Sequence, residues 1–376
     1  MTSRQRLLAL LHGKPVDRCG VCTYTFDGFN SPRLRDDPSA ADAISLIDAE
    51  TEIMLGWGAK VEPNIFLSTS PEASVADERI PEDDHTVIRT TLHTPRGDLH
   101  SLCVTHEGVA TTWKVEHLLK NDEDVERFLS IPYVRPAVSA NQFGDAERRI
   151  GERGLVAVDM GDPICYVADL FEFGEYTVRA WSEPATMRRL LDAMAPRIYD
   201  WLDGVLGLGI RDVVFRLCGP EYASEPYLSP ALFREFVTEY DLPIARKIHD
   251  AGCYLRVHSH GRLANILDHI MALEPDILEP VEGPPSGDIT VGDLARRVGR
   301  NCVLMGNLEP RELEFVDDRV VDDLVRGIME SVAGHAPLII APTDMPIAFP
   351  ISPIYARNIR RYVEATLRWG PQCGWD

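Results

Sequence analysis

Short runs of β-branched residues alternate with longer segments of helical periodicity from about Gly154 to the end of the chain. This repetition predicts a parallel sheet with helices outside it, because each helix returns the chain to the edge where the next parallel strand begins. The predicted strands are Leu155–Asp159, Val213–Leu217, Tyr254–His258, Ile277–Pro280, Cys302–Gly306 and Leu338–Ala341. The predicted helices are Pro184–Leu206, Pro230–Ala251, Arg262–Leu273, Val291–Val298, Asp317–Val332 and Pro353–Trp369.

Two earlier segments supply further strands, one at Cys19–Tyr24 and one near Asn64–Leu67. With them the sheet has eight strands, the number that closes a (β/α)8 barrel. A doubly wound open sheet is the alternative. No G-x-G-x-x-G turn follows a predicted strand, which disfavours a Rossmann domain. The expected fold is therefore an α/β protein with a (β/α)8 TIM barrel.

Residues 1–150 are less regular, and we expect them to form an N-terminal extension together with the first barrel elements. Apolar spacing predicts helices at Ser3–Leu11 and Ala40–Leu55. Apolar and polar residues alternate over His85–Lys114 around the turn Pro95–Asp98, which predicts a β-hairpin near residues 85–115. Residues 151–376 would then form the main part of the barrel.

The composition limits the partners. The formal net charge is 38 − 59 = −21, which argues against binding to nucleic acid or to an anionic membrane surface. No apolar run reaches the roughly 20 residues of a membrane-spanning helix. The eight cysteines are spread too thinly for a disulfide framework, which favours a reducing cytoplasm. Aromatic residues such as Trp57, Phe66 and Trp113 could pack on the barrel or across a homodimer interface.

Ionisable side chains follow nearly every predicted strand. A barrel enzyme builds its active site at the carboxyl ends of its strands, so these residues are candidates for catalysis. Asp159, Asp162 and Glu221 are the candidates for orienting a substrate or carrying a proton. The competing interpretation is structural, because Asp commonly caps helices and Glu commonly forms salt bridges.

The sharpest pattern is the pair His258 and His260 at the end of a predicted strand. Residues i and i+2 of a strand face the same side, so both imidazoles would point into the mouth of the barrel. Two histidines with a carboxylate from another strand form a common zinc site. The candidates for the remaining ligand are Asp344, ranked first, Glu221, ranked second, Cys218 and Glu282.

Five segments, spread over nearly the whole length of the chain, carry a family resemblance. They are Arg4–Arg18, Glu225–Phe236, His258–Arg262, Gly306–Pro310 and Ile359–Gly370. Together they resemble the uroporphyrinogen decarboxylase superfamily. The resemblance implies a (β/α)8 barrel, in agreement with the alternation of strands and helices. It also implies one of two activities: a decarboxylation in haem synthesis, or zinc-dependent methyl transfer to or from a corrinoid protein.

The chain departs from both branches of the superfamily. The decarboxylases carry an R-Q-A-G-R motif that holds substrate carboxylates, and the matching region here, Thr23–Arg33, lacks it. In the methyltransferases, the resemblance implies a His-x-Cys pair and a distal Cys as zinc ligands. His258 matches the first ligand, whereas His260 and Asp344 stand in the positions of the two thiolates.

An imidazole and a carboxylate in place of two thiolates make the ligand set harder and the zinc a stronger Lewis acid for oxygen. We therefore expect a zinc-dependent methyltransferase of the O-demethylase type, which moves a methyl group from a small methoxy compound to a corrinoid protein. The chain has no D-x-H-x-x-G loop, so the corrinoid would sit on a separate partner. The alternatives are a uroporphyrinogen decarboxylase-type carboxy-lyase, a metal-dependent hydrolase on a barrel, and a barrel that only binds a ligand.

Overall fold

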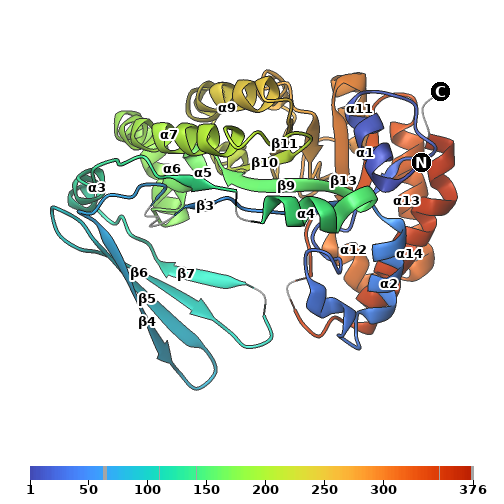
Figure 1. The fold of residues 1–376 in the computed structure, drawn as a ribbon, viewed down its shortest axis with the longest axis horizontal. Coiled ribbons are helices and arrows are strands. Elements are labelled where there is room, and N and C mark those ends of the chain that lie inside the picture. Colours follow the sequence, from blue (N-terminus) through green and yellow to red (C-terminus); the bar gives the residue numbers. More distant parts are fainter. Residues whose placement is uncertain (62–65, 110, 141, 347, 374–376) are drawn as a thin grey trace.

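The computed structural model describes residues 1–61, 66–109, 111–140, 142–346 and 348–373. Its centre is a curled sheet of eight parallel strands in the order β1-β14-β13-β12-β11-β10-β9-β2 (Figure 1). This confirms the α/β class and is consistent with a (β/α)8 barrel. The strands are β1 (Gly20–Val21), β2 (Ile53–Gly56), β9 (Gly154–Gly161), β10 (Val214–Cys218), β11 (Tyr254–His258), β12 (Ile277–Glu279), β13 (Val303–Leu308) and β14 (Leu338–Pro342).

The six strands predicted after Gly154 are all present, with ends that shift by no more than two residues. The predicted strand near Asn64–Leu67 is not found: its first two residues lie outside the described ranges and its last two form a turn. The eighth strand is β2, which overlaps the last three residues of the predicted helix Ala40–Leu55; the helix itself, α2 (Ala41–Glu50), ends earlier. Ile53–Leu55 is buried throughout, so it lacks the alternation that distinguishes a strand from a helix.

Glu52 links β1 and β2, the two strands at the ends of the sheet order. The Glu52 amide donates to Val21 O at 2.8 Å, and the Val21 amide donates to Glu52 Oε2 at 2.6 Å. The carboxylate of Glu52 is fully buried and also binds the guanidinium groups of Arg6 and Arg18. These bonds join the two edges of the curled sheet, as the strand order of a barrel requires.

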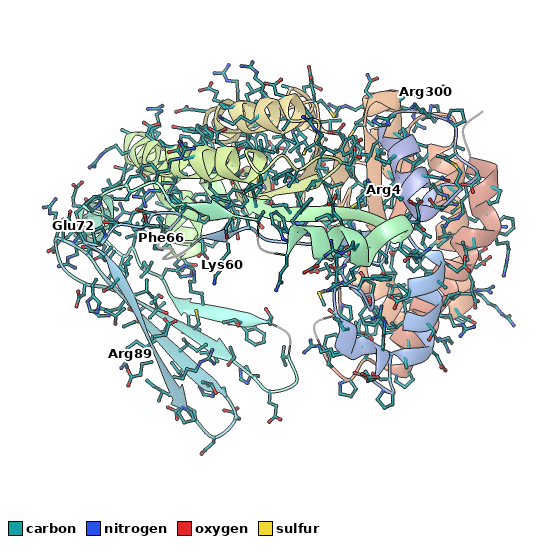
Figure 2. The ribbon with its side chains drawn as sticks, viewed as in Figure 1. Arg4, Lys60, Phe66, Glu72, Arg89 and Arg300 are labelled. Atoms are coloured by element: carbon teal, nitrogen blue, oxygen red, sulfur yellow. The ribbon has the colours of Figure 1, made fainter. Side chains whose placement is uncertain are left out.

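Helix α1 (Ser3–Leu11), which matches its prediction, covers the end of the barrel where the strands begin. Leu7 and Leu10 pack inside the sheet against residues at the strand starts, among them Leu155 and Tyr254. Arg4 extends from the same helix to Gly154 O at the start of β9 (Figure 2). Because this end is filled with apolar side chains, a polar site has room only at the opposite, carboxyl end of the strands.

The remaining helices pack outside the sheet, with the larger apolar cluster between them and the strands. Two predictions need correction. The predicted helix Pro230–Ala251 is interrupted by a π-helical turn at Arg234–Thr238, and only Leu267–Met271 of the predicted Arg262–Leu273 is helical. In the latter, the Leu263 and Ala264 amides instead donate to Asp288 Oδ1. The helices are α3 (Asp122–Leu129), α4 (Phe143–Ile150), α5 (Pro163–Ala168), α6 (Phe173–Ser182), α7 (Pro184–Leu206), α8 (Pro230–Phe233), α9 (Glu239–Asp250), α10 (Leu267–Met271), α11 (Val291–Val298), α12 (Pro310–Phe315), α13 (Asp318–Val332) and α14 (Pro353–Trp369).

A four-stranded antiparallel sheet, here called the arm sheet, projects from the barrel (Figure 1). It contains the predicted hairpin as its two central strands. Its surface is mixed. Arg89, labelled in Figure 2, pairs with Glu78 across two strands, whereas Val75, Trp113 and Val115 are exposed apolar side chains. At its far end the turn at Gly108 touches the segment after β14, where the Phe349 amide donates to Gly108 O at 3.1 Å. The strands are β4 (Ser74–Pro81), β5 (Thr86–His93), β6 (Leu99–Thr105) and β7 (Thr112–Glu116).

A short antiparallel pair, β3 (Lys60–Val61) with β8 (Val138–Ser139), lies beside the barrel. The division of the chain near residue 150 stays a prediction. No helix in the described part of the chain is long and apolar enough to cross a membrane.

Candidate functional site

Three neighbouring strands bring ionisable side chains to the carboxyl end of the barrel. Arg216 of β10 lies opposite Arg256 of β11, and His258 of β11 lies opposite Glu279 of β12. Side chains two residues apart on a strand share a face. Tyr254, two residues before Arg256, packs in the barrel interior, so Arg256 and His258 follow it up the inside of the sheet.

Glu279 is the hub of this cluster. Its Oε1 accepts from Arg216 Nε at 2.5 Å, its Oε2 accepts from Arg256 at 2.5 Å, and its Oε1 lies 2.9 Å from His258 Nδ1. Burial alone would raise the pKa of this carboxyl, but the positive charges of Arg256 and Arg216 and the hydrogen bond from His258 hold it well below its usual range. Glu279 therefore stays ionised, with two guanidinium groups as counter-ions.

Tyr24, from the loop after β1, covers the two arginines. Its hydroxyl contacts Arg216, and its ring centroid lies 5.0 Å from the guanidinium carbon of Arg216 and 5.8 Å from that of Arg256. Burial raises the pKa of Tyr24 above its usual value, so the phenol keeps its proton. Asp159 completes the inner part of the mouth: its carboxylate is mostly exposed and lies 3.7 Å from Arg216.

The two predicted histidines lie side by side, with ring centroids 4.7 Å apart and planes at 82°. His258 Nδ1 is within hydrogen-bond distance of both Glu279 and Arg216. An arginine can only donate, so Nδ1 cannot serve both partners in one tautomer. The carboxylate contact is the shorter one and is charge-assisted, which favours an Nδ1 proton and leaves Nε2 free as an acceptor.

His260 is held in the same manner by a different carboxylate. Its Nδ1 lies 3.0 Å from Glu282 Oε1, and Glu282 Oε2 accepts from the Gly261 amide at 2.8 Å. Burial opposes the charged form of the imidazole, but Glu282, Glu221 and Asp344 outweigh it and raise the pKa of His260. In both predicted imidazoles a carboxylate binds Nδ1, so Nε2 is the ring nitrogen left for another partner.

The other predicted ligands lie around this pair at different depths. Glu221, in the 3-10 turn Pro220–Ala223 after β10, places Oε1 4.0 Å from His258 Nε2. Asp344 follows β14, is exposed, and accepts from the Met345 amide. Cys218 is partly buried, and desolvation raises the pKa of its thiol to about 12, so it is not a ready thiolate.

Asp162 does not lie in the open site. It is fully buried at the N-terminus of α5, where its Oδ1 accepts from the Cys165 amide at 2.7 Å. Burial, followed by the charge of the fully buried Asp241 on α9, raises its pKa well above the usual range. The structure therefore gives Asp162 the capping role that was the alternative interpretation, and removes it from the candidates for contact with a substrate.

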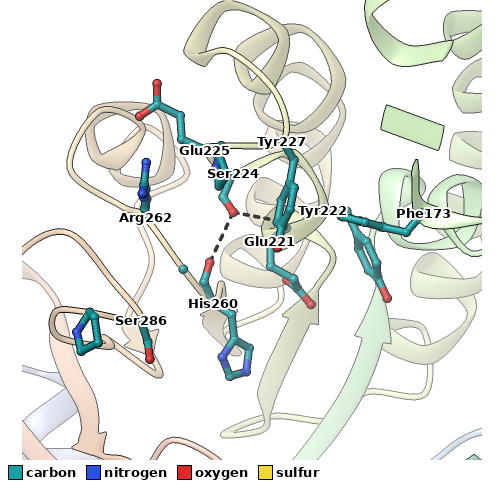
Figure 3. Close-up of a pocket in the computed structure, with 12 residues that line it drawn as sticks. Phe173, Glu221, Tyr222, Ser224, Glu225, Tyr227, His260, Arg262 and Ser286 are labelled. Carbon is teal, nitrogen blue, oxygen red and sulfur yellow. Dashed lines mark hydrogen bonds between the residues drawn. The ribbon is translucent and has the colours of Figure 1, made fainter. Parts of the chain in front are cut away.

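A pocket of about 420 Å³ opens beside His260 and Glu221 (Figure 3). Ser224 ties two of its walls together, because its hydroxyl donates to the backbone oxygens of Glu221 at 2.9 Å and His260 at 3.4 Å. No three His, Cys, Asp or Glu side chains in the described ranges converge tightly enough to form a ready-made metal site. The pocket is lined by Phe173, Glu221, Tyr222, Ser224, Glu225, Pro226, Tyr227, His260, Gly261, Arg262, Pro285 and Ser286.

Sequence reasoning missed the charged hub beneath the histidines. Arg256 lies two residues before His258, so extending the shared face of the strand backwards would have found it. Glu279 is one of the ionisable residues at the end of a predicted strand, but its partners on β10 and β11 depend on the register of the sheet.

Comparison with known proteins places the chain in context. A model of the uroporphyrinogen decarboxylase (URO-D) family matches residues 107–356, which is more than half of the chain. None of the curated proteins matched the sequence.

Solved structures share the fold at low identity. A methyltransferase from Methanosarcina mazei superposes with a TM-score of 0.57 and 15% identity, covering 98% of this chain and 99% of that one. A B12-independent methionine synthase from Shewanella sp. W3-18-1 gives a TM-score of 0.43 and 13% identity, over 69% and 72% of the two chains. The first likeness shows a common fold, and the second is too distant to carry an argument.

Proposed function

The chain belongs to the uroporphyrinogen decarboxylase family, and on that basis we propose that it is a methyltransferase that takes the methyl group of a small methoxy compound. The observation that supports this function best is the pair of imidazoles at the mouth of the barrel. Each is fixed through Nδ1 by its own carboxylate, and one of them borders the 420 Å³ pocket. Once deprotonated, the two imidazoles offer two nitrogen ligands beside a space for a small molecule.

We propose zinc as the metal of this site. Hydrogen bonds from Nδ1 to a carboxylate are the usual support for a zinc-binding histidine, and both His258 and His260 have them. Glu221 is the proposed third ligand, since its carboxylate lies 4.0 Å from His258 Nε2 and a small side-chain movement would bring it into range. Asp344, ranked first from the sequence, takes second place because it is exposed and already accepts from Met345.

The charge balance of the mouth favours a bound cation. Its two arginines, Arg216 and Arg256, are both paired with Glu279. Four further carboxylates line the mouth, three around the histidines and one beside Arg216, so carboxylates outnumber the two arginines and the site as a whole is negative. A bound zinc ion would supply Lewis-acid polarisation of a substrate oxygen. The four carboxylates belong to Glu221, Glu282, Asp159 and Asp344.

The chain's own residues would position the substrate. Asp159 and Arg216 lie 3.7 Å apart at the inner end of the mouth and can hold polar groups of the substrate. The methyl group would leave as a cation equivalent and bond to the electron pair of a reduced corrinoid on a partner protein. The oxygen keeps the electrons of the broken C–O bond and takes a proton from solvent.

Metal analysis of purified protein tests this function first. We expect near-stoichiometric zinc in the wild type and in His335→Ala, an exposed control, and loss of zinc in His258→Ala and His260→Ala. With a reduced corrinoid protein, the wild type should form a methylated corrinoid and a free hydroxyl compound from a methoxy substrate. Undiminished methyl transfer after complete zinc removal would refute the metal's role.

One observation favours the decarboxylase alternative, namely the two arginines at the centre of the barrel. Guanidinium groups are the natural ligands of substrate carboxylates. Here both are committed to Glu279, so a polyanionic substrate would have to displace an internal carboxylate. Release of carbon dioxide instead of methyl transfer would select this alternative, and metal-dependent release of methanol would select the hydrolase.

A further inference from the structure

Strand β4 forms the outer edge of the arm sheet (Figure 1). It pairs with β5 along its whole length, and within the described ranges no strand pairs with its other side. The opposite edge of the sheet, β7, is tied to the barrel by Lys114, whose ammonium group binds Asp169. Every residue of β4 is exposed except the half-buried Ile80. The outer edge of the arm sheet is therefore open to solvent over eight residues.

The ladder between β4 and β5 shows which backbone groups of β4 remain open. The Glu82 amide donates at 2.9 Å to the carbonyl oxygen of His85, which lies directly opposite it in the register of the two strands. Bonded and non-bonded pairs alternate in an antiparallel ladder, so the even-numbered residues of β4 bond to β5. The odd-numbered residues point their backbone groups outward. The amides and carbonyls of Val75, Asp77 and Arg79 are thus available to another strand.

This edge lacks the features that usually prevent an exposed strand from pairing with another chain. Such features are a short strand, a lysine or proline within it, or a bulge. Strand β4 has eight residues, no lysine and a continuous register with β5. Its one proline, Pro81, is the last residue, and the position of the missing amide faces outward. An added strand would therefore meet an unobstructed edge over most of the length of β4.

Two opposite charges on this edge are open to a partner. Arg79 has neither an ion pair nor a side-chain hydrogen bond in the described part of the chain. Asp77 accepts from the hydroxyl of Thr90 at 2.6 Å and has no cationic partner among the described residues. Both residues belong to the outward set. Each would therefore lie directly opposite an outward residue of an added strand.

We propose that β4 pairs antiparallel with β4 of a second copy of this chain, so that two arm sheets join into one across a two-fold axis. Because only outward residues can form the new hydrogen bonds, odd-numbered residues must lie opposite odd-numbered ones. Registers that place Asp77 opposite Asp77, or Arg79 opposite Arg79, bring like charges together. The register between these two places Asp77 of each copy opposite Arg79 of the other. Charge therefore selects one register with two ion pairs, and makes the edge complementary to itself.

The same register accommodates the other residues of β4. Glu78 lies on the two-fold axis opposite Glu78 of the second copy, but each already pairs with its own Arg89 at 2.9 Å, which compensates the like charges. Val75, which is 47% exposed, lies opposite Pro81, so apolar side chains meet at both ends of the paired strands. One pair of strands buries less area than a standard interface, so the dimer should dissociate on dilution. The interface lies on the arm sheet and does not depend on the proposed methyl transfer.

Sedimentation velocity of the full-length protein over a wide range of concentrations tests this inference. We expect a reversible dimer in the wild type. Arg79→Asp should weaken the dimer by about tenfold or more, because both symmetric ion pairs become repulsive. Asp77→Arg should weaken it similarly, although it lowers the net negative charge. The double variant Asp77→Arg/Arg79→Asp exchanges the two charges and should dimerise like the wild type.

Arg96→Asp is the matched control. It changes the net charge as much as Arg79→Asp does, but Arg96 lies in the turn between β5 and β6, away from the outer edge of the sheet. We expect it to leave the dimer unchanged. Equal weakening in Arg96→Asp and Arg79→Asp would mean that overall repulsion, and not the pairing of β4, controls the association.

Hydrogen exchange of the wild type distinguishes pairing at β4 from any other interface. The outward amides of Asp77 and Arg79 should exchange quickly in dilute protein and slowly in concentrated protein, whereas the Glu78 amide should be protected in both. A monomer at every concentration, or a dimer without slower exchange in Ser74–Pro81, would overturn the inference. The same conclusion would follow if the double variant stayed monomeric while keeping the wild-type melting temperature.

Discussion

Glu279 shows how one residue can determine the chemistry of a barrel interior. It is 1% exposed and is the shared partner of Arg216, Arg256 and His258. Without its charge, two guanidinium groups would be buried close together with no counter-ion. The same carboxylate orients the imidazole that we assign to zinc, so it links the stability of the barrel to the geometry of the site.

Glu279→Gln preserves the shape of the side chain and removes its charge. We expect the free energy of unfolding to fall by about 3–5 kcal/mol, the range for breaking a buried ion pair, as measured by urea denaturation. Glu282→Gln is the matched control, because Glu282 lies nearer the rim and pairs with His260 and one amide; about 1–2 kcal/mol is expected there. Equal losses in the two variants would contradict the central role of Glu279.

The buried pair Asp162 and Asp241 gives a pH-dependent prediction. Burial raises the pKa of both carboxyls well above the ordinary 3.8. The folded state therefore binds protons more tightly than the unfolded state, and stability from this pair is full below pH 3.8 and is lost as pH rises through the folded pKa values.

Asp241→Asn removes one of the two titrating groups. The variant should gain stability relative to the wild type as the pH rises above about 4, reaching on the order of 1 kcal/mol or more at pH 8. Asp250→Asn, at the exposed end of the same helix, should show no such trend. Urea midpoints measured from pH 4 to 8 test this prediction. If the midpoints of the wild type and of Asp241→Asn change in parallel with pH, the two carboxyls do not have raised pKa values.

At the scale of elements, the loop from β10 to Glu221 depends on one glycine. Gly219 has φ +135°, and a Cβ atom there would lie 1.8 Å from Asp162 Oδ1. The loop can follow this path only because no side chain is present, and the path places Glu221 beside His258.

Gly219→Ala should therefore cost about 2–5 kcal/mol, the sum of a strained backbone and an overpacked contact. Gly209→Ala is the control with positive φ and open space, since nothing lies within 4 Å of its Cβ position; about 1–2 kcal/mol is expected. Both costs can be read from urea denaturation. A smaller loss at Gly219 than at Gly209 would mean that Asp162 moves aside freely.

At the scale of the whole molecule, the two ends of the barrel differ: one is filled by apolar side chains, and the other carries the ionisable candidate residues. Helix α1 fills the end where the strands begin, and every candidate site residue follows a strand at the other end, where Asp162 alone is fully buried. Stability and function should therefore respond separately to substitutions at the two ends.

Leu7→Ala tests this separation. Leu7 is fully buried, so its truncation should lower the free energy of unfolding by about 2–5 kcal/mol. Leu11→Ala, on the partly buried side of the same helix, should cost less. Below the melting temperature, the zinc content should match the wild type in both variants. A specific loss of zinc in Leu7→Ala would show that the two ends are coupled.

Local patterns were enough to predict much of the fold. The helices Pro184–Leu206, Val291–Val298 and Pro353–Trp369 match their predictions because caps and apolar spacing act within one helix. The adjacency of His258 and His260 was predicted for a similar reason, since it follows from the two-residue repeat of a single strand. In each case the deciding interactions lie close together along the chain.

Tertiary structure decided what the same local patterns left ambiguous. Asp159 and Asp162 end the same strand, yet one is exposed in the mouth and the other is buried against Asp241, 79 residues away. Likewise, the apolar spacing of β2 predicted a helix, and only its pairing with β9 identifies it as a strand. Sheet register and burial depend on which distant segments meet, and the free energy of ionising a side chain depends on its neighbours in the fold. The sequence by itself therefore determined the helices, the strands and their faces. The tertiary packing determined which charged side chains lie in the site.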